Sequence, residues 1–245
     1  VYLAGASHNI RVENCYFYNI RSIPIWAGSD SYDNFFSHNR MELSYTAGIE
    51  VKGKYSTIAN NVFTDNREMA IALENTAPAL SRNNTVIGNI ISATNNAGYG
   101  GIYLFSASYN TIIGNTISDN VAGHGIYIAS ATCNYNAIIG NIIKSEDEIG
   151  IYLKLGNYNI VTGNQIIDCS TDGNGLYSGI RVDSDYNTVS NNLVTTTGAV
   201  LHSYAIECNG DYNQVISNNL TAGNSGTIYN GGSNRIYPQS LLLVD

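Results

Sequence analysis

The feature that most constrains the fold is an internal repeat, which is clearest in the middle of the chain. The sequence Gly-Ile-Tyr-Leu at residues 101–104 returns as Gly-Ile-Tyr-Ile at residues 125–128, an offset of 24. The sequence Tyr-Asn-Thr-Ile-Ile-Gly-Asn at residues 109–115 returns with one change at residues 135–141, an offset of 26. A repeat of this length predicts similar structural units that stack on one another.

Three landmarks recur along the chain with an elastic period near 25 residues. An Asn opens the second half of each copy, with Ser56 in the one vacant position: Asn34, Asn84, Asn110, Asn136, Asn159, Asn187, Asn213 and Asn234. A second Asn follows five residues later in most copies: Asn39, Asn61, Asn89, Asn115, Asn141, Asn164, Asn192 and Asn218. An Ile starts a short alternating run: Ile49, Ile71, Ile102, Ile126, Ile151, Ile180, Ile206 and Ile228.

The apolar residues within each copy alternate with polar or aromatic ones, and no window has the spacing of three and four that a helix requires. The runs are short, rich in Ile, Val, Tyr and Thr, and bounded by Gly, Asn, Asp and Ser, which is typical of strands joined by tight turns. Such a coil cannot bury its inner face alone, so copies must stack, each pairing in parallel with the next about 4.8 Å away. The sequence therefore predicts an all-β parallel β-helix of about ten coils. Residues 1–245 form one domain, which we interpret as a fragment or module of a longer protein.

The repeated Asn and Tyr residues have a structural explanation in such a fold. Asn at a sharp corner tolerates unusual backbone angles, and Asn side chains stacked from coil to coil can form amide ladders. The Tyr before the Asn should stack as an outer column of rings: Tyr109, Tyr135, Tyr158, Tyr186 and Tyr212.

The composition excludes some classes of function. The formal net charge is −8 with 12 % charged residues, which argues against a nucleic-acid partner. No apolar run approaches the length of a membrane span, so we expect no membrane insertion. The four cysteines occupy different places in the repeat and are expected to be unpaired thiols; one bridge between neighbouring coils is the alternative.

Function must be read from the side chains that point outward. Residues one and three places after each landmark Ile should face solvent. The first such column is Glu50, Ala72, Tyr103, Tyr127, Tyr152, Arg181, Glu207 and Tyr229, and the second is Lys52, Glu74, Phe105, Ala129, Lys154, Asp183, Asn209 and Asn230. An exposed aromatic patch of Tyr103, Phe105, Tyr127 and Tyr152, with Lys154 beside it, suits a sugar chain. The alternative is that Tyr, present 19 times, simply suits a strand face.

The charges on this face have a structural interpretation and a catalytic one. Three pairs one coil apart are expected to form salt-bridge ladders, namely Lys52 with Glu74, Lys154 with Asp183, and Arg181 with Glu207. This pairing leaves Glu50 and His124 unpaired.

Two catalytic constellations are open. A glycosidase needs two carboxylates across a bond, for which Glu50 with Glu74, or Asp183 with Glu207, could serve. A lyase needs a base and a neutralising cation, for which His124, Lys154 and Arg181 could serve, beside Tyr127 and Tyr152.

The repeated units at residues 101–104 and 109–115 resemble the parallel β-helix repeats of the carbohydrate-binding and sugar-hydrolase superfamily. That superfamily includes pectate-lyase-like enzymes, alginate epimerases, the periplasmic maturation protein of nitrous oxide reductase, phage tailspikes and disaggregatase. The resemblance covers nearly the whole chain and implies a single-stranded right-handed parallel β-helix, or solenoid. It identifies the fold and not the chemistry.

Catalytic signatures of these relatives are mostly missing. Residues 123–125, Gly-His-Gly, look like an element of polygalacturonases, but the acidic and Arg-x-Lys elements that accompany it are absent, so the resemblance assigns His124 no role. The Asp-Pro-His-Asp motif of alginate epimerases is also absent. No metal site is predicted; for Ca²⁺ the nearest acidic group, residues 183–185, reads as a turn. Four scattered His and two Met show no copper-ligand spacing.

Two hypotheses of different class follow. In the first, the chain is an extracellular or cell-surface protein that binds a polysaccharide on its outer strand face and cleaves it, as a hydrolase or a lyase. In the second, it is a non-catalytic structural module of a surface, sheath or tailspike assembly, whose aromatic face packs against another copy in a homo-oligomer.

Overall fold

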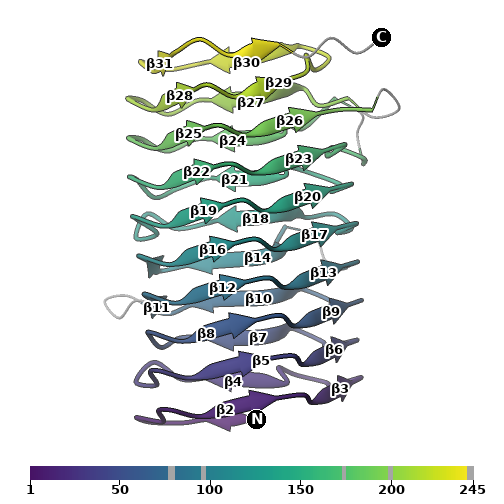
Figure 1. The fold of residues 1–245 in the computed structure, drawn as a ribbon, viewed down its shortest axis with the longest axis vertical. Helices are drawn as coiled ribbons and strands as arrows, with labels where there is room; N and C mark the ends of the chain where they lie inside the picture. Colours follow the sequence, from purple (N-terminus) through teal and green to yellow (C-terminus); the bar gives the residue numbers. More distant parts are fainter. Residues whose placement is uncertain (77–80, 95–97, 173–174, 198–200, 242–245) are drawn as a thin grey trace.

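The computed structural model describes residues 1–76, 81–94, 98–172, 175–197 and 201–241. The chain winds into a rod of stacked coils, with its two ends at opposite ends of the rod (Figure 1). Every regular element of the described residues is a β-strand, and neighbouring coils pair in parallel. The predicted all-β parallel β-helix is therefore confirmed.

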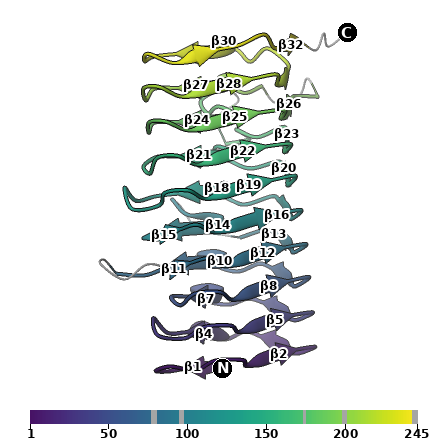
Figure 2. The same ribbon diagram turned by 60° about the vertical axis from the view of Figure 1, so that its left-hand side comes forward.

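Successive strands enter three ten-stranded sheets in rotation, so that one strand of each sheet makes a coil, as the turned view also shows (Figure 2). The first sheet contains β1 (Tyr2–Leu3), β4 (Ile25–Ala27), β7 (Ala47–Val51), β10 (Met69–Glu74), β14 (Gly100–Phe105), β18 (His124–Ile128), β21 (Ile151–Leu153), β24 (Ile180–Val182), β27 (Tyr204–Cys208) and β30 (Gly226–Asn230). The second contains β2 (Arg11–Glu13), β5 (Phe35–Ser37), β8 (Thr57–Ala59), β12 (Thr85–Ile87), β16 (Thr111–Ile113), β19 (Ala137–Ile139), β22 (Ile160–Thr162), β25 (Thr188–Ser190), β28 (Gln214–Ile216) and β31 (Arg235–Ile236). The third contains β3 (Tyr16–Tyr18), β6 (Arg40–Glu42), β9 (Val62–Thr64), β13 (Ile90–Ser92), β17 (Thr116–Ser118), β20 (Ile142–Lys144), β23 (Gln165–Ile167), β26 (Leu193–Thr195), β29 (Asn219–Leu220) and β32 (Ser240–Leu241). A further pair, β11 (Ser81–Arg82) and β15 (Ala107–Ser108), lies outside these sheets.

The core is a set of inward columns of Ile, Val and Leu. In the first sheet Ile102 pairs with Ile126, and Ile126 pairs with Ile151, so the landmark isoleucines are vertical neighbours. All three are fully buried. Burial of one such side chain stabilises the fold by about 1.5–3 kcal/mol, so these columns are the main favourable contribution to stacking.

The asparagines that recur at the two landmark positions form two buried amide ladders. At Asn115, Oδ1 accepts a hydrogen bond from the backbone N–H of Asn89 (2.9 Å), and Nδ2 donates to Oδ1 of Asn141 (2.9 Å). The predicted backbone strain lies one residue earlier, because Gly114 (φ +63°) and Tyr109 (φ +59°) are left-handed and the ladder asparagines are not. The expectation that Asn itself supplies the unusual angle is wrong.

The predicted outer tyrosine column is confirmed. Ring centroids of Tyr109 and Tyr135 lie 5.0 Å apart, and the stack continues through Tyr158, Tyr186 and Tyr212 at 5.1–5.3 Å. These rings remain about half exposed. Because each ring face is covered by its neighbours, the column presents ring edges and hydroxyls to solvent.

In five copies a glycine stands directly before the landmark Ile and lets the backbone approach the third sheet: Gly48, Gly101, Gly125, Gly150 and Gly179. A Cβ on Gly125 would lie 2.5 Å from Cγ2 of Ile143, inside the core. The residue before this glycine, His124, therefore lies on the outer face, where its ring contacts Tyr127 at 4.8 Å between centroids. All four cysteines are free thiols, as expected. Among the described residues, no helix is long and apolar enough to cross a membrane.

Candidate functional site

The outer face of the first sheet has nearly the register that the repeat predicts. In its first column Tyr103 pairs with Tyr127 and Tyr127 with Tyr152. The column continues to Arg181, Glu207 and Tyr229 in one direction and to Ala72 and Glu50 in the other. Trp26 pairs with Glu50 and extends the column, which the sequence interpretation missed because the first coils match the repeat poorly. Asn230 was wrongly placed in the second column, since it pairs with Cys208.

The aromatic residues on this face form a packed cluster. Tyr127 stacks on Tyr152 with 5.3 Å between ring centroids and 9° between planes, and its other neighbour Tyr103 is 5.7 Å away. Tyr103 and Tyr127 are each only 8 % exposed, whereas Phe105 is 39 % exposed. The expectation of an open platform is therefore wrong for Tyr103 and Tyr127, and Phe105 is the ring of this patch that a ligand could cover.

A groove opens beside this cluster, over β7, β10 and β14. Its volume is about 320 Å³, and it is lined by Ile23, Thr46, Ala47, Glu50, Glu68, Met69, Glu74, Tyr99, Tyr103 and Phe105. The groove thus brings together Glu50 and Glu74, which the sequence placed in neighbouring coils, with a third carboxylate, Glu68. The last was missed because it lies in the turn before β10, outside the alternating run.

The two carboxylates predicted as a catalytic pair have different surroundings. Oε1 of Glu50 accepts a hydrogen bond from Nε1 of Trp26 (3.1 Å) and an ion pair from Nζ of Lys52 (3.0 Å), both of which stabilise a carboxylate. Glu74 is half-buried and has no hydrogen-bond donor among the described residues. Burial, and then the charge of Glu50, raise the pKa of Glu74. This difference is what a general acid and its ionised partner require.

The charged ladders differ from the prediction in two of three cases. Lys52 pairs with Glu50 of its own strand instead of Glu74. Lys154 lies over the ring of Tyr127, 5.9 Å from its centroid, and makes no ion pair with Asp183. Residues two apart on one strand share a face about 6.6 Å apart, and register partners on neighbouring coils lie about 4.8 Å apart, so a long Lys side chain can reach either and its conformation decides the partner. The remaining pair, Arg181 with Glu207, is confirmed by a contact of 3.6 Å.

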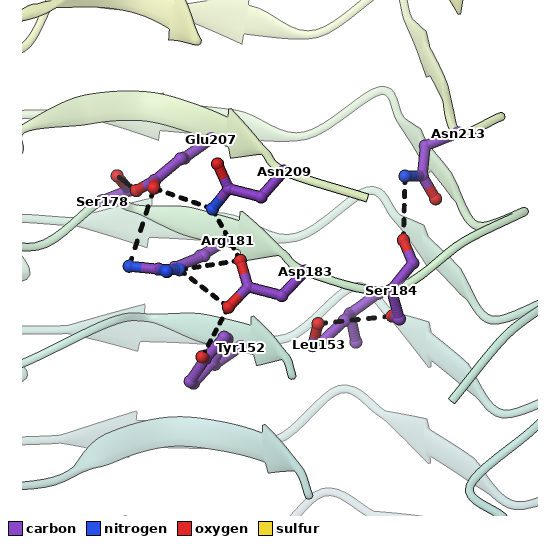
Figure 3. A network of polar contacts seen from close by, with 9 residues as sticks. All are labelled: Tyr152, Leu153, Ser178, Arg181, Asp183, Ser184, Glu207, Asn209 and Asn213. Atoms are coloured by element: carbon purple, nitrogen blue, oxygen red, sulfur yellow. Dashed lines mark hydrogen bonds and ion pairs between the residues drawn. The ribbon is translucent and has the colours of Figure 1, made fainter. Parts of the chain in front are cut away.

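Asp183 is the centre of a polar network in the C-terminal half of this face (Figure 3). Nε of Arg181 donates to Oδ1 of Asp183 (2.9 Å), and the hydroxyl of Tyr152 donates to Oδ2 (2.7 Å). Nδ2 of Asn209 also donates to Oδ1 (2.7 Å). Burial alone would raise the pKa of Asp183, but these hydrogen bonds hold it below its ordinary value.

Glu207 completes the network. Its Oε2 accepts a hydrogen bond from the hydroxyl of Ser178 (2.7 Å), and its Oε1 accepts one from Asn209 (2.9 Å). The guanidinium of Arg181 lies between the carboxylates of Asp183 and Glu207. This second predicted acid pair is therefore bridged by protein donors and resembles a stabilising network more than an open catalytic pair.

His124 is enclosed and partnered, contrary to expectation. Its Nδ1 accepts a hydrogen bond from the backbone N–H of Ile149 (3.3 Å) and lies 3.2 Å from Oε2 of Glu148. Burial, with Lys154 and Arg181 nearby, lowers the pKa of His124 to about 3, and burial raises the pKa of Glu148. The imidazole is thus neutral near pH 7, so its 3.2 Å contact with Glu148 is not an ion pair at that pH. Among the described contacts nothing presents it to a substrate as a base.

The comparison with protein families is decisive for the lineage. The family model described as "Periplasmic copper-binding protein (NosD)" matches residues 1–175. The chain belongs to the NosD family. Curated protein sequences contain no match to this member of the family.

Solved structures similar to this NosD-family chain share its fold. The A-module of mannuronan C-5 epimerase AlgE6 from Azotobacter vinelandii is 12 % identical, with TM-score 0.57, over 96 % of this chain and 58 % of its own. The tailspike protein of E. coli bacteriophage HK620, solved with a pentasaccharide, is 12 % identical, with TM-score 0.64, over 96 % and 53 %. The enzymatically active domain of bacteriophage CBA120 tailspike protein 2 is 12 % identical, with TM-score 0.65, over 95 % and 38 %. The chain thus spans less than two thirds of each of these structures, and the likeness shows a shared parallel β-helix fold.

The family description names copper, so the positions of the side chains that could bind this metal are relevant. Imidazole and sulfur ligands favour this metal, and a site needs several of them together. His8 and His38 are on different coils of the exposed surface, and His202 is buried far along the rod. No three His, Cys, Asp or Glu side chains of the described residues come close enough to hold a metal ion. The residues present do not fit a copper centre.

Proposed function

We propose that this NosD-family chain binds an extended polysaccharide along the outer face of the first sheet and hydrolyses it in the groove over β7, β10 and β14. The observation that carries the proposal is the contrast between Glu50, which accepts bonds from Trp26 and Lys52, and Glu74, which is half-buried and meets no donor in the part of the chain that the structure describes. The polysaccharide-bound or polysaccharide-modifying proteins of the same fold support the substrate class.

In this mechanism Glu74 is the general acid. Its raised pKa favours the protonated form, and that proton is transferred to the glycosidic oxygen as the bond to the anomeric carbon breaks. The carboxylate of Glu50 attacks the anomeric carbon and forms a glycosyl–enzyme ester, which a water deprotonated by Glu74 then hydrolyses, or it removes a proton from a water that attacks the anomeric carbon itself. A retained or inverted anomer in the first product distinguishes these two routes.

The aromatic residues have different parts in binding. Phe105 offers the exposed ring on which a pyranose can stack, and Tyr99 forms the groove wall beside it. Tyr103, Tyr127 and Tyr152 support this surface as a packed cluster. Lys154, over Tyr127, offers an ammonium group to sugar hydroxyls three coils from Glu74.

The test is incubation with a panel of neutral, acidic and amino polysaccharides, followed by measurement of reducing ends and of absorbance near 235 nm. Hydrolysis raises only the reducing ends, whereas elimination raises both. Glu74→Gln and Glu50→Gln should each lower turnover at least about 100-fold, since proton transfer and attack are both lost. Asp65→Asn removes an exposed carboxylate outside the groove and is the matched control. Turnover unaffected by Glu74→Gln would refute the assignment.

The non-catalytic alternative has one observation in its favour, the satisfied network around Arg181, which is what a rigid structural rod needs. Light scattering separates the two, because a homo-oligomer buried through the face of Tyr152 would cover the groove's approach. The family description names the periplasm, and we infer from it a location outside the cytoplasm. An extracellular or cell-surface location is the more specific proposal. A Ca²⁺ ion, the cofactor considered from the sequence, is tested by chelation in the same assay.

A further inference from the structure

We propose that the groove selects a sugar residue that carries an amino group, and that Glu68 is the residue that recognises it. This inference rests on the proposed function, because it names the substrate class of the same groove. It differs from a simple extension of the epimerase likeness, since mannuronan is a polyanion.

The charges in the groove are the first step. Three carboxylates line it: Glu50, Glu68 and Glu74. The nearby ammonium of Lys52 lies 3.0 Å from Glu50 and neutralises the charge of that carboxylate. Glu68 forms no side-chain hydrogen bond or ion pair with the described residues. An excess of negative charge therefore faces the groove, and a concave site concentrates that potential on a ligand.

The second step is the division of labour among the carboxylates. Glu74 must hold a proton to act as the acid, and an ammonium beside it would favour its ionised form. Glu50 already has its cation. Glu68 is left as the group that can pair with a substrate ammonium, and its own charge contributes to the raised pKa of Glu74.

The position of Glu68 is fixed by the coil below. Its backbone N–H donates to the carbonyl of Thr46 (3.3 Å), and the N–H of Arg67 donates to the carbonyl of Ser44 (2.8 Å). The turn that carries the carboxylate is thus held before a ligand arrives, which lowers the entropic cost of binding. The aromatic rings of Tyr99 and Phe105 in the same groove also favour a cation near their faces.

A polyuronate would meet the opposite conditions. Its carboxylates would lie against Glu68 and Glu50 with only Lys52 to offset them. The next ammonium on this face, that of Lys154, is three coils away, about 14 Å at one strand spacing per coil. We therefore expect neutral sugars to be accepted, amino sugars to be preferred and uronates to be rejected.

The experiment uses β-1,4 glucosamine hexamers and the same hexamers fully N-acetylated, in which a neutral acetamide replaces each ammonium, with mannuronate hexamers as the anionic probe. Calorimetric affinities are measured at pH 6 in low and high salt. The glucosamine hexamer should bind at least about tenfold more tightly than its acetylated form, and salt should reduce the difference. Glu68→Gln should remove most of this preference. Asp65→Asn, which removes an exposed carboxylate of the same coil at the end of β9, should leave it intact.

Each result decides between the proposals. Equal affinity for the two glucosamine hexamers, or tighter binding of the mannuronate hexamer, overturns the amino-sugar inference but leaves hydrolysis by Glu74 standing. A preference that survives Glu68→Gln overturns the role of that residue. Failure of every hexamer to bind, with no polysaccharide cleaved, overturns the proposed function together with this inference.

Discussion

Replacement of Asn115 by Ala tests whether the amide ladder holds the coils together. Oδ1 of Asn115 accepts from the backbone N–H and from Nδ2 of Asn89 (both 2.9 Å), and Nδ2 donates to Oδ1 of Asn141 (2.9 Å) and to the carbonyl of Val86 (3.0 Å). These four hydrogen bonds and a fifth, which Nδ2 donates to the carbonyl of Ile113 (3.2 Å), are lost at about 1 kcal/mol each, so the free energy of unfolding should fall by about 5 kcal/mol. The loss could be larger because the orphaned partners are buried from water.

Urea unfolding followed by far-UV circular dichroism measures this change. Gln165→Ala is the matched control, because it removes an exposed amide that makes no side-chain hydrogen bond with the described residues; its effect should stay below about 0.5 kcal/mol. The expected loss is a large fraction of a typical free energy of unfolding of about 5–15 kcal/mol, so the variant should unfold at a low urea concentration. A loss of less than about 1 kcal/mol for Asn115→Ala would show that the ladder does not hold the stack.

Three further predictions concern buried histidine, thiols and the tyrosine column. Burial lowers the pKa of His202 to about 4. Between about pH 4 and 6.5 the unfolded chain therefore binds a proton at this residue that the folded chain does not. The free energy of unfolding contributed by His202 should fall on acidification by about 1.4 kcal/mol per pH unit. Because Glu146, whose pKa burial raises, gives a slope of opposite sign, the measurement is the difference between wild type and His202→Gln across this window; parallel curves would contradict it. Only Cys15 should react quickly with a thiol reagent in the folded protein, and all four cysteines should react in urea; a second fast thiol would show that the coils open. Tyr158→Ala should cost about 1–2 kcal/mol through its two stacking contacts, and Tyr158→Gly less, because φ is +60°; equal losses would mean that backbone strain is not offset by stacking.

Much of the fold follows from the repeat because an offset of whole copies fixes the register. Once residues 102 and 126 are aligned, alternation decides which side chains enter the core, and a slip by one residue would turn all of them outward. The outer columns therefore came out nearly as predicted from the sequence. Asn230 is the exception, since it lies two places after Ile228 and pairs with the buried Cys208 instead of with the outward column.

The site was harder to predict, for two physical reasons. Side-chain conformation decides which charges meet, and alternation carries no information about it; Lys52 turns to Glu50 on its own strand instead of to Glu74 on the next. The groove also depends on turns that vary in length between copies. Glu68 and Tyr99 lie in such turns before β10 and β14, where the repeat sets no register. The low exposure of Tyr127 could not be predicted either, because rings of the neighbouring coils cover it and the sequence of one copy does not show this contact.

The ladder through Asn115 also has a direction. Every side-chain amide in it donates to the amide oxygen of the following coil, from Asn39 through to Gln239, and the sense is never reversed. A coil duplicated, deleted or transplanted as a unit keeps this polarity and needs no adjustment of its neighbours. Two rods meeting head to head would instead oppose donor with donor or oxygen with oxygen, so growth by this contact is possible only by translation along the axis, as in a filament.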